Sequence, residues 1–150
     1  MMDTQLVLTG FLKRAARYFP NKQIISRTSA TMTHRIAFKD YVKRTHRLAD
    51  ALTKLGMTRG TKVGTFAWNH HRHLEAYFAI PCSGAILHTI NIRLAPEHIV
   101  YIINHAQDEI LLIDGDLFPL VEPALGHLKS VKHIIVMSDD KTAPESSFPN

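Results

Sequence analysis

The chain has 150 residues, of which 45% are hydrophobic, and its mean hydropathy is −0.06. Glycine and proline number only seven each, so the composition excludes a collagen-like or low-complexity chain and favours a globular domain. The longest apolar runs are far shorter than the roughly 20 residues of a membrane-spanning helix. The single cysteine, Cys82, excludes an internal disulfide and a zinc site built from several thiolates. No basic segment followed by an apolar stretch opens the chain, so we expect no secretory signal and a cytoplasmic location.

Charge is distributed unevenly along the chain, although the net charge is only +5. Residues 1–72 contain fourteen Lys and Arg against three acidic residues, whereas residues 73–150 contain four against ten. A basic half can form a nucleic-acid face. Here the basic residues are spread over several predicted elements, and no stacking aromatic residues alternate with them. We therefore expect solvated helix surfaces and no nucleic-acid partner; steeply salt-dependent DNA binding would indicate the opposite.

The first 60 residues predict a helix, a small hairpin and a second helix. Residues 8–19 place their apolar side chains on one helical stripe, and Pro20 ends it. Two strand-like segments, 23–28 and 34–38, flank a turn rich in Ser and Thr and can pair as a hairpin. From residue 39 the apolar residues return to helical spacing: Tyr41, Thr45, Leu48, Leu52 and Leu55. Gly56 then stands where a left-handed helix cap is expected.

From residue 62 onward, strands and helices alternate. The predicted strands cover residues 62–67, 85–90, 109–114 and 132–137. The helix after the first strand should present Leu74, Tyr77 and Phe78 as its apolar face. Pro96 and Glu97 open the next helix, whose apolar face is predicted to be Ile99, Ile102, Ile103 and Ala106. Asp116 is expected to cap a short helix that Pro123 disturbs.

This alternation predicts an α/β fold: a partial doubly wound, mainly parallel sheet flanked by helices and preceded by an N-terminal helix and a small hairpin. We expect residues 1–137 to form the folded part. Residues 138–150 are rich in Ser, Asp and Pro and are expected to form a linker-like tail.

Polar residues follow two of the predicted strands at the points where the strands end. Ligands of open parallel sheets bind beyond the carboxyl ends of the strands, so neighbouring strands would bring both clusters to one edge. The candidate substrate contacts at this edge are Trp68, Asn69, His70, His88, Thr89 and Asn91. The alternative is a purely structural role, because these residue types also cap helices and fill turns.

No catalytic or metal-binding constellation is recognisable. His71 and Glu75 are four residues apart and His70 and His73 are three apart, but no third ligand follows at a suitable spacing. We therefore expect no metal site and place most of the ten histidines at the surface or partly buried. Cys82 is interpreted as a small buried apolar residue, because the Gly-x-Ser-x-Gly turn of a nucleophilic elbow does not occur.

Several segments together resemble the AMP-forming acyl-CoA synthetases. Residues 36–57, with Arg-Leu-Ala-Asp-Ala-Leu followed by Leu-Gly, resemble the first conserved stretch of that family, and residues 59–68 resemble its Gly-Asp-x-Val strand. Residues 69–81 and 84–91 are similar to the fatty-acyl branch in particular. The likeness covers nearly the whole chain up to Val136 and continues through residues 94–97, 101–106 and 111–114.

The resemblance implies a two-step ligase reaction. A fatty acid and ATP form an acyl-adenylate, coenzyme A then takes the acyl group as a thioester, and Mg²⁺ accompanies the ATP. The family's phosphate-binding motif ending in Pro-Lys-Gly, its ribose-binding Asp and its catalytic Lys do not occur in these 150 residues. The resemblance therefore implies an N-terminal fragment of a medium- or long-chain fatty-acid–CoA ligase that is inactive and cofactor-free by itself. It assigns no active-site residue to a position here.

Three positions depart from the family pattern. Thr61 stands where an Asp is common, Ile92 replaces a usual proline, and Ala95 replaces a helix-capping Ser or Thr. Losing the cap costs on the order of 1 kcal/mol, which leaves the loop 91–96 less firmly held.

The alternative function is a stand-alone α/β binding or self-association module. A partial sheet exposes an edge strand and apolar surface, so we expect a homo-oligomer, in the simplest case a dimer. Peripheral association with a membrane is a further expectation for the full-length protein.

Overall fold

The computed structural model describes residues 3, 7–28 and 32–139. The chain forms two compact units: unit 1 comprises residues up to Arg59 and Asn69–Ala85, and unit 2 comprises Gly60–Trp68 and the residues from Ile86 onward. Within the described ranges, no helix combines the length and apolarity needed to cross a membrane. The proposed boundary between residues 137 and 138 stays a prediction, because residues 140–150 lie outside the described part.

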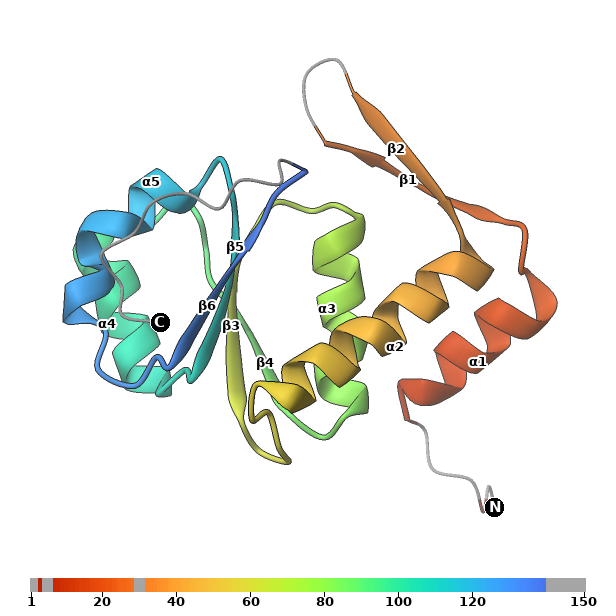
Figure 1. The fold of residues 1–150 in the computed structure, drawn as a ribbon, viewed down its shortest axis with the longest axis horizontal. Coiled ribbons are helices and arrows are strands. Elements are labelled where there is room, and N and C mark those ends of the chain that lie inside the picture. Colours follow the sequence, from red (N-terminus) through yellow and green to blue (C-terminus); the bar gives the residue numbers. More distant parts are fainter. Residues whose placement is uncertain (1–2, 4–6, 29–31, 140–150) are drawn as a thin grey trace. The chain divides into compact units, whose positions relative to one another are not determined.

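Unit 1 contains three helices and a two-stranded antiparallel hairpin (Figure 1). Its elements are α1 (Thr9–Tyr18), β1 (Gln23–Arg27), β2 (Thr33–Ala37), α2 (Phe38–Lys54) and α3 (His71–Cys82). The predicted helices and the hairpin are confirmed to within a few residues. Gly56, shortly after α2, has a φ of +96°, a left-handed conformation that glycine adopts without steric cost. Leu55, predicted to lie on the apolar stripe, falls beyond the end of α2 and is 38% exposed.

Tyr41 is the centre of the core of unit 1. It is 2% exposed and packs with Leu12 and Ile36, and the half-buried residues around this cluster are Ile24, Phe38, Val42, Leu74, Phe78 and Cys82. The Tyr41 hydroxyl donates to the carbonyl of Leu74 at 2.9 Å, which joins α2 to α3. Burial raises the pKa of Tyr41, so the phenol remains a neutral donor.

The buried face of α3 differs from the predicted one. The predicted stripe is only partly covered, since Leu74 and Phe78 are half-buried and Tyr77 is 42% exposed. The buried residues are instead His71, His73, Glu75, Ala76, Ala79 and Ile80. Glu75 can be buried because its carboxylate accepts hydrogen bonds from Arg44 Nε at 2.6 Å and Nη2 at 3.3 Å. Apolar spacing alone could not reveal this pairing.

Unit 2 is built on a parallel four-stranded sheet with the order β4-β3-β5-β6 (Figure 1). Its elements are β3 (Lys62–Phe66), β4 (Ile86–Thr89), α4 (Pro96–Ala106), β5 (Ile110–Asp114), α5 (Phe118–Val121), the 3₁₀ helix η1 (Glu122–His127) and β6 (His133–Met137). The predicted α/β class with a mainly parallel sheet is confirmed. All five residues of β5 are buried, as its apolar run predicts.

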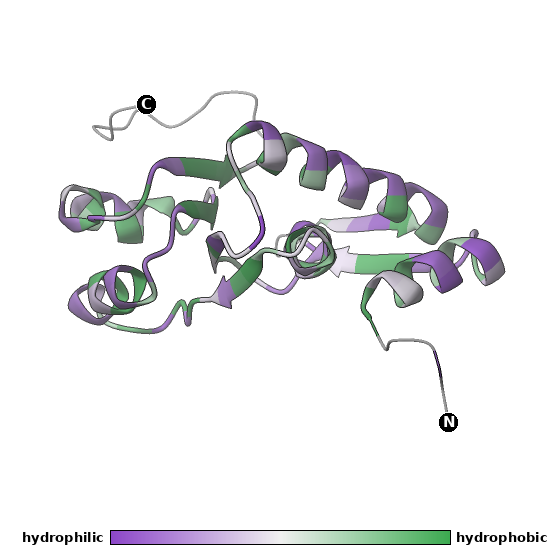
Figure 2. Ribbon diagram, turned by 90° about the horizontal axis from the view of Figure 1, so that it is seen from below, coloured by the Kyte–Doolittle hydropathy of each residue, from purple (hydrophilic) through white to green (hydrophobic). Residues whose placement is uncertain are grey.

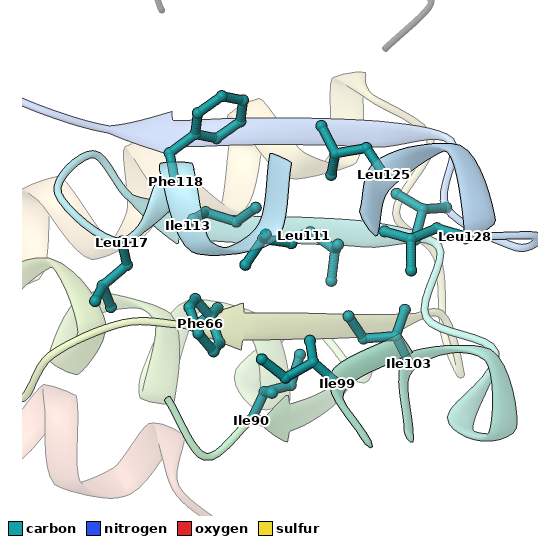
Figure 3. Close-up of a cluster of buried hydrophobic side chains, with 12 residues drawn as sticks. Phe66, Ile90, Ile99, Ile103, Leu111, Ile113, Leu117, Phe118, Leu125 and Leu128 are labelled. Carbon is teal, nitrogen blue, oxygen red and sulfur yellow. The ribbon is translucent and has the colours of Figure 1, made fainter. Parts of the chain in front are cut away.

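The core of unit 2 lies between the sheet and its helices. Figure 2 shows that the helices carry both hydrophobic and hydrophilic residues. Alternate sheet residues, such as Phe66, Leu111 and Ile113, pack with Ile99 and Ile103 of α4 in the cluster drawn in Figure 3. The remaining buried members of this cluster are Ile90, Leu117, Phe118, Val121, Leu125, Leu128 and Val131. The predicted inner face of α4 is confirmed at its two most buried positions.

The short helix after β5 begins later than predicted. Its N-cap is Leu117, and Asp116 does not cap it. Asp116 Oδ2 instead accepts a hydrogen bond from the indole Nε1 of Trp68 at 2.9 Å. The helix changes to 3₁₀ geometry at Glu122, next to Pro123, so the predicted disturbance is confirmed. Ala95 forms the N-cap of α4 without a side-chain hydrogen bond, as its missing hydroxyl predicts.

Gly64 allows two side chains to approach each other across the middle of β3. It lies opposite His88 of β4 and Leu111 of β5. His88 Nδ1 and Asp108 Oδ2 are 2.7 Å apart, and Asp108 is fully buried. A Cβ atom at position 64 would lie 2.9 Å from Asp108 Oδ2 and 2.5 Å from Leu111 Cδ2. The position therefore has no room for a side chain.

Two histidine rings stack between the hairpin and α3 in unit 1. The ring centroids of His34 and His71 are 3.9 Å apart, with an interplanar angle of 22°. His71 is 3% exposed. Burial lowers its pKa from 6.5 to about 4, and the charges of His34, Arg72, His70 and Arg44 act in the same direction. The folded protein therefore holds His71 as a neutral ring.

We expect Gly64→Ala to lower the free energy of unfolding by about 1–3 kcal/mol, because the added methyl group overpacks the site. Urea denaturation followed by circular dichroism measures this change. Gly126→Ala is the matched control, since a Cβ there meets no atom within 4 Å. Equal effects of the two substitutions would refute the close-packing argument.

Stability should fall as the pH drops from about 6.5 to about 4, because the unfolded chain binds a proton on His71 that the folded chain excludes. The contribution of His71 is fully present above pH 6.5, and its complete loss corresponds to about 3 kcal/mol. Urea denaturation at pH 7 and pH 5 should show a smaller difference for His71→Phe than for the unmodified chain. His98→Gln, at an exposed position on α4, is the control and should keep the original difference. An unchanged pH dependence in His71→Phe would contradict the assignment.

Candidate functional site

The carboxyl ends of β3 and β4 lie side by side, as the predicted binding edge requires. The two strands are parallel, and Thr65 pairs with Thr89 in the register. Trp68 follows β3, Thr89 ends β4, and Asn91 comes shortly after it. The structure thus brings three of the six candidate residues to one edge of the sheet in unit 2.

Trp68 is held at this edge by two carboxylates. Its backbone N–H donates to Asp114 Oδ2 at 2.7 Å, and its indole Nε1 donates to Asp116 Oδ2 at 2.9 Å. Asp114 is the last residue of β5 and is 2% exposed, so the carboxylate that anchors Trp68 is buried. Trp68 nevertheless remains 45% exposed and can offer its indole ring to a ligand.

The other candidates in unit 2 have different surroundings. Asn91 is exposed, and its Oδ1 accepts a hydrogen bond from the backbone N–H of Arg93 at 3.0 Å, an Asx-turn that shapes the loop. Thr89 is exposed at the end of β4. The ring of His88 pairs with Asp108 instead. Asp108 lies just before the first residue of β5, whereas the candidate binding edge is formed by the last residues of the strands.

Asn69 and His70 belong to unit 1, where they line a pocket of about 250 Å³. His70 is the N-cap of α3, because its Nδ1 accepts a hydrogen bond from the backbone N–H of His73 at 3.4 Å. The other lining residues are Ile24, Ile25, Ser26, His73, Leu74 and Tyr77. The pocket therefore combines apolar side chains with imidazole, amide and hydroxyl groups, a mixture suited to a small ligand group that is partly polar.

Sequence reasoning missed the contribution of β1 and Tyr77 to this pocket. No local pattern showed that the hairpin would pack beside the start of α3, because that contact joins segments more than 40 residues apart. The apolar spacing predicts Tyr77 on the buried face of its helix, yet Tyr77 is 42% exposed and its ring lies 4.9 Å from that of His73.

The histidines do not assemble into a metal site. His70, His71 and His73 are buried, while the other seven of the ten histidines are half-buried or exposed. The prediction that most histidines lie at the surface or are partly buried is therefore confirmed. Among residues 3, 7–28 and 32–139, no three His, Cys, Asp or Glu side chains are grouped to hold a metal ion. Glu75, the carboxylate nearest in sequence to the buried histidines, is paired with Arg44.

Cys82 is half-buried near the end of α3, less covered than predicted. Burial raises the pKa of its thiol, so at neutral pH it is the protonated, weakly nucleophilic form.

Comparison with known proteins identifies relatives over almost the entire chain. Residues 12–150 match the family described as AMP-binding enzyme. The long-chain-fatty-acid–CoA ligase of Thermus thermophilus is 49% identical over 145 residues, which cover 97% of this chain and 26% of the relative. The medium-chain-fatty-acid–CoA ligase of Ectopseudomonas oleovorans is 36% identical, over 99% of this chain and 27% of that protein.

Solved structures have the same fold. An anthranilate CoA ligase in complex with anthranoyl-AMP superposes with a TM-score of 0.80 at 25% identity, covering 90% of this chain and 26% of that one. A long-chain-fatty-acid-CoA ligase from Archaeoglobus fulgidus gives a TM-score of 0.80 at 19% identity, over 91% of this chain and 28% of that one. The chain thus spans about a quarter of the length of these relatives and aligns with their N-terminal part. On the strength of the family match over residues 12–150, the chain belongs to the AMP-binding enzyme family.

Proposed function

We propose that this chain forms the N-terminal part of a medium- or long-chain fatty-acid–CoA ligase. The complete enzyme would join a fatty acid to AMP from ATP and then transfer the acyl group to coenzyme A. The observation that carries this proposal is the 49% identity, over 97% of the chain, with the Thermus thermophilus long-chain ligase.

In this proposal the residues of the chain bind and orient substrate and do not carry out the chemical steps. The substrate-facing residues would be Trp68, Thr89 and Asn91 in unit 2, and Asn69 and His70 in unit 1. Trp68 is suited to this role because two aspartates fix its orientation while much of its ring stays exposed. His88 would act through its pairing with Asp108, which stabilises the strand that ends at Thr89.

ATP, coenzyme A and Mg²⁺ would serve the complete enzyme. The described residues do not fit a site for Mg²⁺-ATP, because they offer neither a glycine-rich phosphate loop nor a cluster of carboxylates. ATP would supply the activating phosphoanhydride bond, and the side chains that hold it would have to come from the rest of the enzyme. No step of the reaction is therefore assigned to this chain alone.

A chimeric enzyme tests the proposed function. The N-terminal quarter of the Thermus thermophilus ligase is replaced by these 150 residues, and pyrophosphate release and acyl-CoA formation are measured with palmitate. We expect activity within about tenfold of the parent, because the two segments share 49% of their residues. The 150-residue chain alone should release no pyrophosphate. Turnover by the chain alone, or a folded but inactive chimera, would overturn the proposal.

The contribution of the sheet edge is tested in the same chimera. Trp68→Ala should lower kcat/KM about tenfold, which corresponds to roughly 1.4 kcal/mol of lost binding. Tyr101→Ala is the matched control, since Tyr101 is an aromatic residue on α4 that is 64% exposed. If both variants retain full activity, Trp68 has no part in substrate binding.

We also propose a cytoplasmic, peripherally membrane-associated enzyme that forms homo-oligomers. In the sheet of unit 2, β4 and β6 are the outer strands, and Ile86 on β4 is 50% exposed. Such edges favour pairing with another chain. This feature also supports the alternative of a self-association module, which predicts concentration-dependent sedimentation but no activity of the chimera.

A further inference from the structure

A groove of about 480 Å³ runs between α1, α2 and α3 in unit 1 and is separate from the candidate residues described above. Its walls are mostly apolar and include Leu12, Ala16, Val42, Ala49, Phe78 and Ala79. The volume lies in the range of small-molecule sites in proteins. Small alanine side chains on all three helices leave space along the groove that larger residues would fill.

The polar rim of the groove is positively charged. Lys13 and Arg17 are four residues apart on α1 and therefore share one face of that helix, and His46 of α2 also lines the groove. No Asp or Glu is among the lining residues, and α1 contains no acidic residue at all. An apolar chain in the groove would thus place a terminal anion near two permanent cations.

We propose that this groove binds a single-chain carboxylate amphiphile, that is, a free fatty acid, at a site separate from the substrate-binding edge. The alkyl chain would lie along the alanine-lined walls, and the carboxylate would bind between Lys13 and Arg17. The apolar walls favour burial of an alkyl chain of about twelve carbons. Fatty-acid binding in this groove does not depend on the ligase function.

Cys82 provides a direct measure of occupancy. It lines the groove and is the single cysteine of the chain, so a thiol reagent modifies one position only. The rate of alkylation by N-ethylmaleimide is measured at about pH 8, where thiols are partly ionised, with dodecanoate added below its critical micelle concentration. We expect saturating dodecanoate to slow the reaction at least fivefold. Dodecyltrimethylammonium, which has the same chain but a positive head group, should protect much less.

Variants separate specific binding from general hydrophobic association. The double variant Lys13→Gln, Arg17→Gln should raise the Kd for dodecanoate at least tenfold, as measured by calorimetry and by protection of Cys82. Arg14→Gln is the matched control, because Arg14 lies on the same helix but does not line the groove. Ala16→Phe should abolish binding by filling the groove, and circular dichroism verifies that each variant is folded.

Three results would overturn the inference. Equal protection by the cationic and anionic amphiphiles would show that the rim charges do not select the ligand. Unchanged affinity in the folded double variant would have the same meaning. Protection of Cys82 that rises with protein concentration and without added dodecanoate would show that a second copy of the chain covers the groove.

Discussion

The absence of a side chain at Gly64 is the constraint on which the sheet of unit 2 depends. His88 and Asp108 can pair at 2.7 Å only because the strand between them has no Cβ atom at this position. Burial raises the pKa of Asp108, while the hydrogen bond from His88 and the nearby charge of Lys62 oppose that shift. The backbone carbonyl of Asp108 also accepts a hydrogen bond from Ser130 at 2.9 Å, which holds the segment before β6. One residue thus makes polar contacts with β4 and with the segment that leads into β6.

Unit 1 contains a comparable arrangement, in which the partner of the buried carboxylate is an arginine. Its buried carboxylate is Glu75, which receives two hydrogen bonds from Arg44, and α2 and α3 are thereby joined. Arg44 remains partly exposed, so the charge of the pair is not sealed from water. Removing one member of a fully buried pair typically costs about 3–5 kcal/mol. The exposure of Arg44 to water reduces this cost for the Arg44–Glu75 pair. These two pairs therefore join α2 to α3 in unit 1, and β4 to the segment before β5 in unit 2.

The helices and strands can be predicted from the sequence, because apolar periodicity reports which positions are buried locally. The hydrogen-bond partners of polar side chains cannot be predicted where those partners are distant in the sequence. The sequence predicts that Asp116 caps a helix, but Asp116 accepts a hydrogen bond from Trp68, which precedes it by 48 residues. The candidate site divides in the same way. Strand alternation places Trp68 and Thr89 at one edge of a parallel sheet, and the structure has them there. The pocket beside Asn69 and His70 needed knowledge of where the β1 strand packs. Likewise, the alanines on α1 and α2 predict that these helices pack against other elements. They do not predict the groove, because it forms only where three helices meet.

The uneven charge of the chain acquires a physical explanation from these contacts. Many acidic residues of the second half form specific interactions: Glu75 with Arg44, Asp108 with His88, Glu109 with Lys132, and Asp114 and Asp116 with Trp68. Glu75 and Glu109 are thus paired with permanent cations, whereas Asp114 and Asp116 accept hydrogen bonds from the neutral Trp68. The basic residues Lys13 and Arg17, by contrast, border an apolar groove whose lining contains no acidic side chain. Binding of a DNA duplex requires a broad positive surface that contacts many phosphates. Two cations beside an apolar groove are instead suited to a single anionic group that carries an alkyl chain.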